Sequence, residues 1–187
     1  MKKVSLFLAL LIVSLSSVGA SEQFASPNGK ITVTVSDEGG SPKYQVSLNG
    51  NVMIQPSALG LKMNFDDLTQ GLTMKTCDIS KFEDNYILKT TKQSHVSVVA
   101  TEAVCKFEKD GRQVLDVIFR VTDRDVAFRY KVYSRKVRGG ETLSGVVENE
   151  VSGFVLPEGT TTFLCPQSKP MGGFARTSPS YETSYTS

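Results

Sequence analysis

The chain has 187 residues, 21 lysines and arginines, 19 acidic residues and one histidine, so its formal net charge at pH 7 is +2. This balance gives no support to nucleic-acid or anionic-membrane binding, because both need a basic surface that displaces counterions. The length suits one domain. The absence of tryptophan weakens the case for a free-standing carbohydrate-binding module, which would stack sugars on exposed aromatic rings.

The N-terminus has the pattern of a secretory signal. Met1–Lys3 is positively charged, Val4–Val13 is apolar, and the stretch that follows ends in small residues at Ala20. The apolar run is shorter than the roughly 20 residues that span a bilayer, and no cysteine marks a lipoprotein. We therefore expect residues 1–20 to be removed and a domain of residues 21–187, starting at Ser21, to work in the periplasm or outside the cell.

The first half of this domain predicts antiparallel strands. Ile31–Val35 alternates apolar residues with threonine, which indicates a half-buried strand. Asp37–Pro42 ("DEGGSP") is a turn, and Tyr44–Leu48 alternates again. Asn49-Gly50 then gives the strongest short-range hairpin signal, so a returning strand should follow it.

The second half repeats this theme. Strands are expected at 95–100, 103–108, 114–121 and 126–132, with hairpin turns at Asp110-Gly111 and at Thr122–Asp125. After Arg138 the pattern loosens into glycine- and proline-rich loops, with short strands at Gly153–Leu156 and Thr161–Leu164. No long stretch has a helical period, so the fold class is all-β, an antiparallel sandwich or barrel.

Three cysteines, Cys77, Cys105 and Cys165, are too few and too widely spaced for a disulfide framework or a zinc site. One pair could be bridged, with the third cysteine left over. The favoured interpretation is small buried side chains on strands, since Cys105 alternates with Ala103 and Phe107 on one strand face.

The candidate catalytic side chains are few. His95 is the single histidine and lies on the opposite strand face from Val96 and Val98, which favours a solvent-facing or hydrogen-bonded role. No G-x-S-x-G elbow, P-loop, GxGxxG, HExxH or EF-hand pattern occurs. The residues alone therefore predict no catalytic set.

Four acid pairs could in principle serve as the two carboxylates of a glycosidase. They are Asp37-Glu38, Asp66-Asp67, Asp123 with Asp125, and Glu148 with Glu150. The first three lie in predicted turns, where aspartate is favoured because it bonds the local backbone. The last pair is expected in a solvated loop.

Three phrases resemble the N-terminal domain of glycoside hydrolase family 97. They are Ser26–Lys30 ("SPNGK"), Tyr44–Gly50 ("YQVSLNG") and Pro56–Leu61 ("PSALGL"). A fourth, Asp116–Val132, is similar to a family hairpin, although Arg124-Asp125 stands where the family prefers Asp-Gly. Order and spacing make the resemblance stronger than any one phrase.

This resemblance implies a β-super-sandwich of the galactose-mutarotase type, here incomplete, followed in the family by a (β/α)₈ barrel that carries the catalytic acids. Family members are calcium-dependent and hydrolyse oligosaccharides, as inverting α-glucosidases or retaining α-galactosidases. The resemblance makes Glu182 a calcium ligand. We expect a catalytically silent N-terminal fragment of such an enzyme.

Two other hypotheses remain. The chain could be a secreted β-sandwich that binds a carbohydrate or a partner without enzymatic activity. A mutarotase-like epimerase is disfavoured, because that chemistry uses paired histidines and His95 stands alone.

Overall fold

This computed structural model describes residues 19–90, 92, 94–136 and 140–163. The chain divides into two units, Met1–Leu156 and Pro157–Ser187. The second is described only as far as Phe163 and contains a turn in which the Thr160 N–H donates to the Pro157 carbonyl at 3.2 Å. Within the described ranges no helix has the length and apolar character needed to cross a bilayer.

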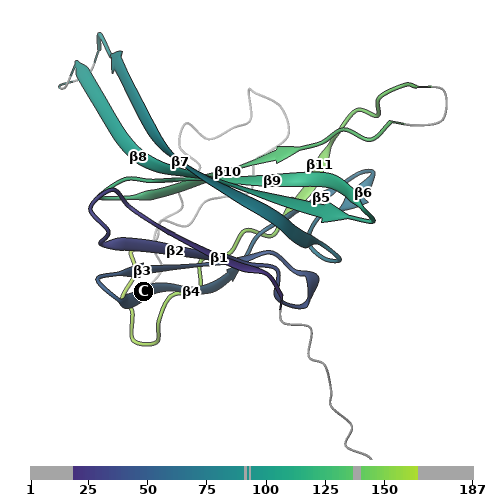
Figure 1. Cartoon of the computed structure of the whole chain (residues 1–187), viewed down its shortest axis with the longest axis horizontal. Helices are drawn as coiled ribbons and strands as arrows, with labels where there is room; N and C mark the ends of the chain where they lie inside the picture. Colours follow the sequence, from purple (N-terminus) through teal and green to yellow (C-terminus); the bar gives the residue numbers. More distant parts are fainter. Residues whose placement is uncertain (1–18, 91, 93, 137–139, 164–187) are drawn as a thin grey trace, which may run out of the picture. The chain divides into compact units, whose positions relative to one another are not determined.

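The first unit is built from strands (Figure 1). These are β1 (Ser21–Ala25), β2 (Ile31–Ser36), β3 (Lys43–Leu48), β4 (Asn51–Ala58), β5 (Leu61–Met63), β6 (Asp66–Asp67), β7 (Thr73–Ile87), β8 (His95–Lys109), β9 (Arg112–Val121), β10 (Val126–Val132) and β11 (Val147–Glu150). They form three antiparallel sheets in the orders β1-β2-β3-β4, β10-β9-β8-β7 and β11-β5-β6. The prediction of an all-β antiparallel fold is confirmed.

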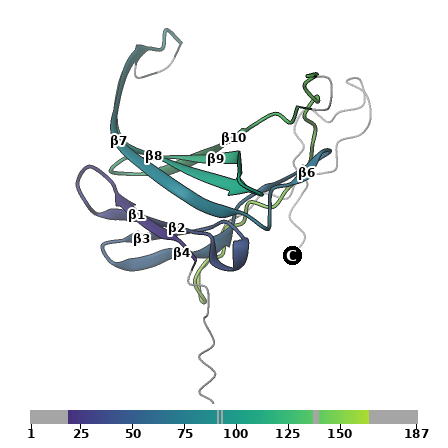
Figure 2. The ribbon, with the colours of Figure 1, turned by 45° about the vertical axis from the view of Figure 1, so that its right-hand side comes forward.

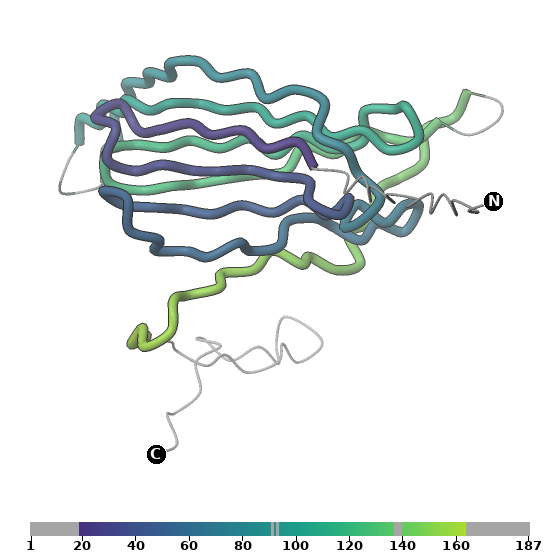
Figure 3. Tube along the Cα trace, turned by 60° about the horizontal axis from the view of Figure 1, so that its bottom comes forward, coloured from purple at the N-terminus to yellow at the C-terminus, as the bar shows by residue number. Residues whose placement is uncertain are grey.

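The two four-stranded sheets pack face to face, with their strands running in similar directions (Figure 3). Alternate residues of β2 face the core, as the period of two predicted: Val33 and Val35 are fully buried. Aromatic rings join the sheets, since the Phe119 ring of β9 lies 5.6 Å from Phe24 and 6.0 Å from Tyr44. The core therefore lies between these layers.

The two predicted two-residue hairpin turns are confirmed. Asn49 and Gly50 have φ of 50° and 81°, and Asp110 and Gly111 have φ of 51° and 72°. Such paired positive φ values twist a two-residue turn in the same sense as its flanking strands. The turns therefore set the registers of β3 with β4 and of β8 with β9.

The longest strands differ from the sequence prediction. β7 was not predicted, and the two segments expected at 95–100 and 103–108 form one strand, β8. From Phe82 to Ile87, β7 pairs with β8 beyond the point where β9 ends, since the last β8–β9 pair is Thr101 with Val121. Figures 1 and 2 show this end of β7 and β8 as a ribbon of two strands that extends past the sheet.

The region after Arg138 also corrects the prediction. The expected strand Gly153–Leu156 is reduced to one bridge, between Val155 and Gln55 of β4. Residues 161–163 are not a strand, and residue 164 lies outside the described residues. Conversely, β11 forms where a loop was expected, because it pairs with β5.

Cys77 and Cys105 lie opposite each other on β7 and β8 and form a disulfide. Cys105 is fully buried on the strand face that it shares with Ala103 and Phe107, as predicted. The sequence left open whether one pair of cysteines is bridged, and the structure shows that Cys77 and Cys105 are that pair. Cys165 lies outside the described residues.

Candidate functional site

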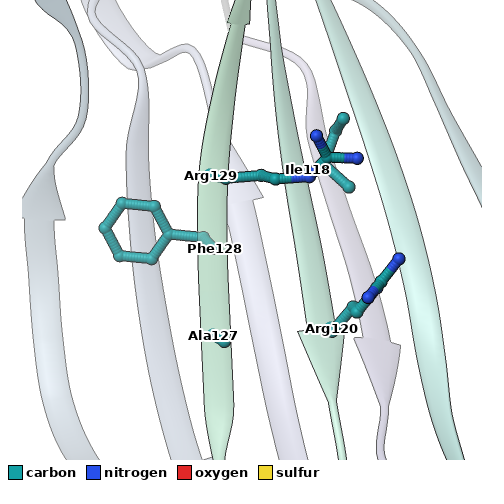
Figure 4. A pocket seen from close by; sticks show the side chains of 5 residues that line it. All are labelled: Ile118, Arg120, Ala127, Phe128 and Arg129. Carbon is teal, nitrogen blue, oxygen red and sulfur yellow. The ribbon is translucent and has the colours of Figure 1, made fainter. Parts of the chain in front are cut away.

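The face of the β7–β10 sheet that points away from β1–β4 carries a shallow pocket (Figure 4). The pocket measures about 170 Å³ and is lined by Ile118, Arg120, Ala127, Phe128 and Arg129. In Figure 4, Arg129 extends toward Ile118, while Phe128 points to the other side of β10. That side is the core, where the Phe128 ring lies 5.4 Å from Tyr44. The pocket floor is thus apolar and its edges carry two guanidinium groups.

The two arginines of the pocket differ in how they are held. The Arg120 Nε donates to Glu102 at 2.8 Å, and its Cζ lies 3.6 Å from the centre of the Phe82 ring. Within the described part of the chain, the side chain of Arg129 makes no hydrogen bond or ion pair. A guanidinium offers five N–H donors to hydroxyl or carboxylate oxygens. The pocket therefore has the chemistry of a binding surface, and its lining supplies no nucleophile or general base.

A buried carboxylate lies on the same face. Asp116 of β9 is 2% exposed and accepts hydrogen bonds from Gln113 Nε2 at 2.6 Å and from the Tyr133 hydroxyl at 2.7 Å. Lys131 Nζ lies 3.8 Å from the same group. Both carboxylate oxygens are satisfied by protein donors, which is the usual arrangement of a structural buried acid.

Sequence reasoning missed both features of this face. Residues 114–119 of β9 are all buried, so this part of the strand resembles a continuous apolar run. The alternation that places Asp116, Ile118 and Arg120 on one face is therefore not evident from the sequence. The signal that could have found them is the charge at every second position of β10, where Arg129 and Lys131 are exposed.

The pair Asp37-Glu38 does not form a two-carboxylate site. Asp37 is 5% exposed, and its Oδ2 accepts from the Met74 N–H at 2.7 Å. Glu38 begins a short 3₁₀ turn and pairs with Lys43 at 3.5 Å. One acid is structural and the other is at the surface.

Asp66 and Asp67 form the short strand β6, so their placement in a turn was wrong. Asp66 pairs with Lys109 at 2.9 Å. Asp67 accepts from the backbone N–H and the hydroxyl of Thr69. The Thr69 hydroxyl is the main reason why the pKa of Asp67 lies below its usual value, with smaller effects from the Thr69 N–H and the lysines nearby. Local backbone bonding was predicted for these acids, and Asp67 provides it.

Asp123 lies in the predicted turn between β9 and β10, but its partner is distant in sequence. Its Oδ1 accepts from the Asn28 N–H at 2.9 Å, so this turn contacts the "SPNGK" turn. The nearby Asp125 closes its own turn, because its carbonyl accepts from the Thr122 N–H at 3.0 Å. This acid pair is accounted for by turn structure.

Glu148 and Glu150 are exposed on β11 and not in the solvated loop that the sequence predicted. Glu150 accepts from the Ser152 hydroxyl at 2.6 Å. His95 is exposed at the start of β8, opposite Ile87, which fits the expected surface position.

Metal binding is not visible in the described part of the chain. Across those residues there is no group of three or more His, Cys, Asp or Glu side chains that could hold a metal ion. Glu182, the residue assigned to calcium by resemblance, lies outside the described residues.

The comparisons with known proteins agree with one another. The family model for the N-terminal domain of glycosyl hydrolase 97 matches residues 24–187. The probable retaining alpha-galactosidase of Streptomyces bingchenggensis (strain BCW-1) is 33% identical over 125 residues, which are 67% of this chain and 18% of that protein.

Solved structures share the fold. The crystal structure of a beta-arabinopyranosidase is 40% identical, with a TM-score of 0.74 over 88% of this chain and 26% of that chain. A family 97 enzyme from Pseudoalteromonas sp. strain K8, in complex with panose, is 21% identical with a TM-score of 0.63 and covers 73% of this chain and 20% of its own. The same fold is seen in its acarbose complex. The chain thus spans about a quarter or less of the length of these relatives.

Proposed function

Because this chain belongs to glycoside hydrolase family 97 through its N-terminal domain, we propose that it is the N-terminal part of a secreted α-glycosidase. The parent enzyme hydrolyses α-linked glycosides of oligosaccharides, and the portion given by residues 21–187 is catalytically silent. The observation that carries this proposal is the family match over residues 24–187. The catalytic acids of the family belong to a barrel, and the described acids here have structural or surface roles.

The substrate class that we propose is the α-galactoside type. The relatives at 33% and 40% identity are an alpha-galactosidase and a beta-arabinopyranosidase, whereas the enzyme bound to panose is 21% identical. A β-L-arabinopyranoside has the ring configuration of an α-D-galactopyranoside and lacks only its hydroxymethyl group. One pocket shape can therefore serve both sugars, with a retaining outcome as in the galactosidase relative.

Calcium dependence and secretion are parts of the same proposal. Glu182 would be one oxygen ligand of a calcium ion, which needs several more from the rest of the enzyme. The leader of residues 1–20 supports export. The disulfide between Cys77 and Cys105 supports an oxidising compartment, because such bonds persist mainly outside the cytosol.

The test has two parts. Residues 21–187 are assayed with calcium on nitrophenyl α-galactoside, β-L-arabinopyranoside and α-glucoside, and no turnover is expected. The DNA beyond the codon for Ser187 is then sequenced. A continuing frame that encodes a (β/α)₈ barrel supports the proposal, and the protein from that frame should prefer the first two substrates. Turnover by residues 21–187 alone, or preference for the glucoside, contradicts it.

A second candidate function is a secreted β-sandwich that binds a glycan or a partner. The observation that favours it is the pocket at Arg120 and Arg129, where one guanidinium is held in place and the other has no described partner. Glycan-array binding that is lost in Arg129→Ala would support this function. Absence of binding to any glycan leaves the enzyme fragment as the better explanation.

A further inference from the structure

The carboxylate of Asp37 lies directly after β2, and one of its oxygens is buried without a partner. The residue is 5% exposed, and Oδ2 accepts from the Met74 N–H at 2.7 Å. Among the described residues, Oδ1 is the one buried side-chain polar atom that has no hydrogen bond. A buried carboxylate oxygen without a donor is costly, and more so than a neutral group. The position of Oδ1 therefore points to a donor that the uncleaved chain does not provide.

The residues in front of this oxygen are the last two of the expected leader. A β-carbon on Gly19 would lie 2.5 Å from Asp37 Oδ1, so Gly19 covers it closely. The Asp37 N–H donates to the Ala20 carbonyl at 3.1 Å. Lys43 of the neighbouring strand β3 does not supply the missing donor, because it pairs with Glu38 at 3.5 Å. The open acceptor is thus next to the expected cleavage point.

We propose that Asp37 is the binding site for the chain's own α-ammonium group, which forms at Ser21 when the leader is removed. This inference rests on the proposed secretory leader. A signal peptidase hydrolyses the Ala20–Ser21 bond with one water, whose hydroxyl goes to the Ala20 carbonyl carbon. The Ser21 nitrogen leaves as an amine and takes up a proton to become a cation at pH 7. Removal of Gly19 and Ala20 clears the space in front of Oδ1.

Geometry and charge both favour this pairing. The Ser21 nitrogen is bonded to the carbonyl carbon of Ala20, whose oxygen accepts from the Asp37 backbone N–H at 3.1 Å, so the new cation arises next to Asp37. An ammonium supplies three donors, and charge-assisted bonds to a carboxylate are about twice as strong as neutral ones. Through Met74 the same carboxylate contacts β7 of the opposite sheet. Removal of the leader therefore connects the edge strand β1, through Asp37, to both four-stranded sheets.

The experiment measures the reactivity of the α-amine in the mature chain, residues 21–187, prepared with a native Ser21 end. The protein is treated with a limiting amount of acetylating reagent at pH 7, and the N-terminal peptide is quantified by mass spectrometry. We expect the amine to react about tenfold more slowly than in Asp37→Asn, because the carboxylate holds it as an unreactive ammonium. A tenfold change corresponds to about 1.4 kcal/mol. The asparagine oxygen still accepts from Met74. Asp123→Asn, a change in a distant turn, should react like the unchanged chain.

Equal α-amine reactivity in the unchanged chain and in Asp37→Asn overturns the inference. If Asp37→Asn does not fold, a chain that begins at Ser16 and keeps residues 16–20 before Ser21 replaces it: its α-amine is five residues from Ser21, so it should react about tenfold faster, and the Tm of this chain should be lower. Equal reactivity and equal Tm for these two chains also overturn the inference. The premise is tested separately by the N-terminal mass of the exported protein, so absence of cleavage near Ser21 counts against the secretory proposal alone.

Discussion

The backbone N–H of Gly60 donates to the phenolic oxygen of Tyr130 at 2.9 Å. This bond joins the "PSALGL" phrase to the phrase Asp116–Val132, through residues 70 positions apart. The same hydroxyl lies 2.6 Å from Ser152 Oγ. Two phrases that identify the family in sequence are therefore in direct contact, and their common role is to connect the small β11-β5-β6 sheet to β10.

Tyr130→Phe tests this contact. The change leaves the Gly60 N–H without its acceptor and removes the bond to Ser152, so we expect the free energy of unfolding to fall by about 1–3 kcal/mol. Urea denaturation followed by circular dichroism measures it. Tyr86→Phe is the matched control, since Tyr86 is 43% exposed on the ribbon. Equal stability of the two variants would show that the Tyr130 bonds carry no net stability.

Gly60→Ala should lower the free energy of unfolding more than the addition of one methyl group suggests. Gly60 has φ of +136°, and a β-carbon there would lie 2.5 Å from the Leu68 carbonyl oxygen, which is rigid backbone. We expect a loss of at least about 2 kcal/mol. Gly29→Ala is the control, because its φ is +73° but nothing lies within 4 Å of the added carbon. It should lose only about 1 kcal/mol, and the prediction is wrong if both variants lose the same amount in denaturant titrations.

The burial of Tyr44 predicts that the folded state loses stability at alkaline pH. It is 2% exposed and donates to the Gly153 carbonyl at 3.0 Å. Burial, with a smaller effect from Tyr130, raises the pKa of Tyr44 from 10.0 to about 12. The folded state therefore holds this proton more tightly than the unfolded state. The stabilisation is complete below pH 10 and is lost as the pH rises toward 12.

Unfolding free energies measured below pH 10 and again between pH 10 and 12 check this expectation. Tyr44→Phe should lower stability below pH 10 by about 1 kcal/mol, through loss of its hydrogen bond, and should flatten the fall above it. Lysines titrate in the same range in both proteins, so the difference between the two curves isolates the phenol. Parallel curves would contradict the assignment.

Local signals explain which parts of the fold were predictable. Asn49-Gly50 sets a hairpin by itself, because its positive φ values suit few other residue pairs. β7 has no such signal: its sequence is mixed and mostly exposed, and it is a strand because its whole length pairs with β8. A strand that depends on a distant partner is not visible in its own residues.

In the candidate site, too, contacts with residues distant in sequence could not be predicted. The local backbone bonding expected for the acids held for Asp67, whose partner Thr69 is two residues away. Asp123 accepts from Asn28, and Asp37 from Met74, so their partners are set by the packing of the sheets. The arginine pocket likewise depends on β9 and β10 lying side by side, which the sequence predicted without showing which faces are covered.

The disulfide gives the last prediction. Cys77 and Cys105 are 28 residues apart, and closing a loop of that length restricts the unfolded chain by about 3–4 kcal/mol in the chain-entropy model. The double change Cys77→Ala with Cys105→Ala should cost about that much stability in urea titrations. Cys165→Ser is the control and should leave non-reducing peptide maps unchanged.

The loss should be concentrated in β7. β8 stays paired with β9 from Thr101 to Lys109, whereas β7 is an edge strand whose one ladder is to β8. Hydrogen exchange of the double variant should therefore show faster exchange of β7 amides, while β9 and β10 keep their protection. Uniform loss across all four strands would mean that the bridge stabilises the sheet as a whole. Retained protection in β7 would mean that the β7–β8 ladder holds without the bridge.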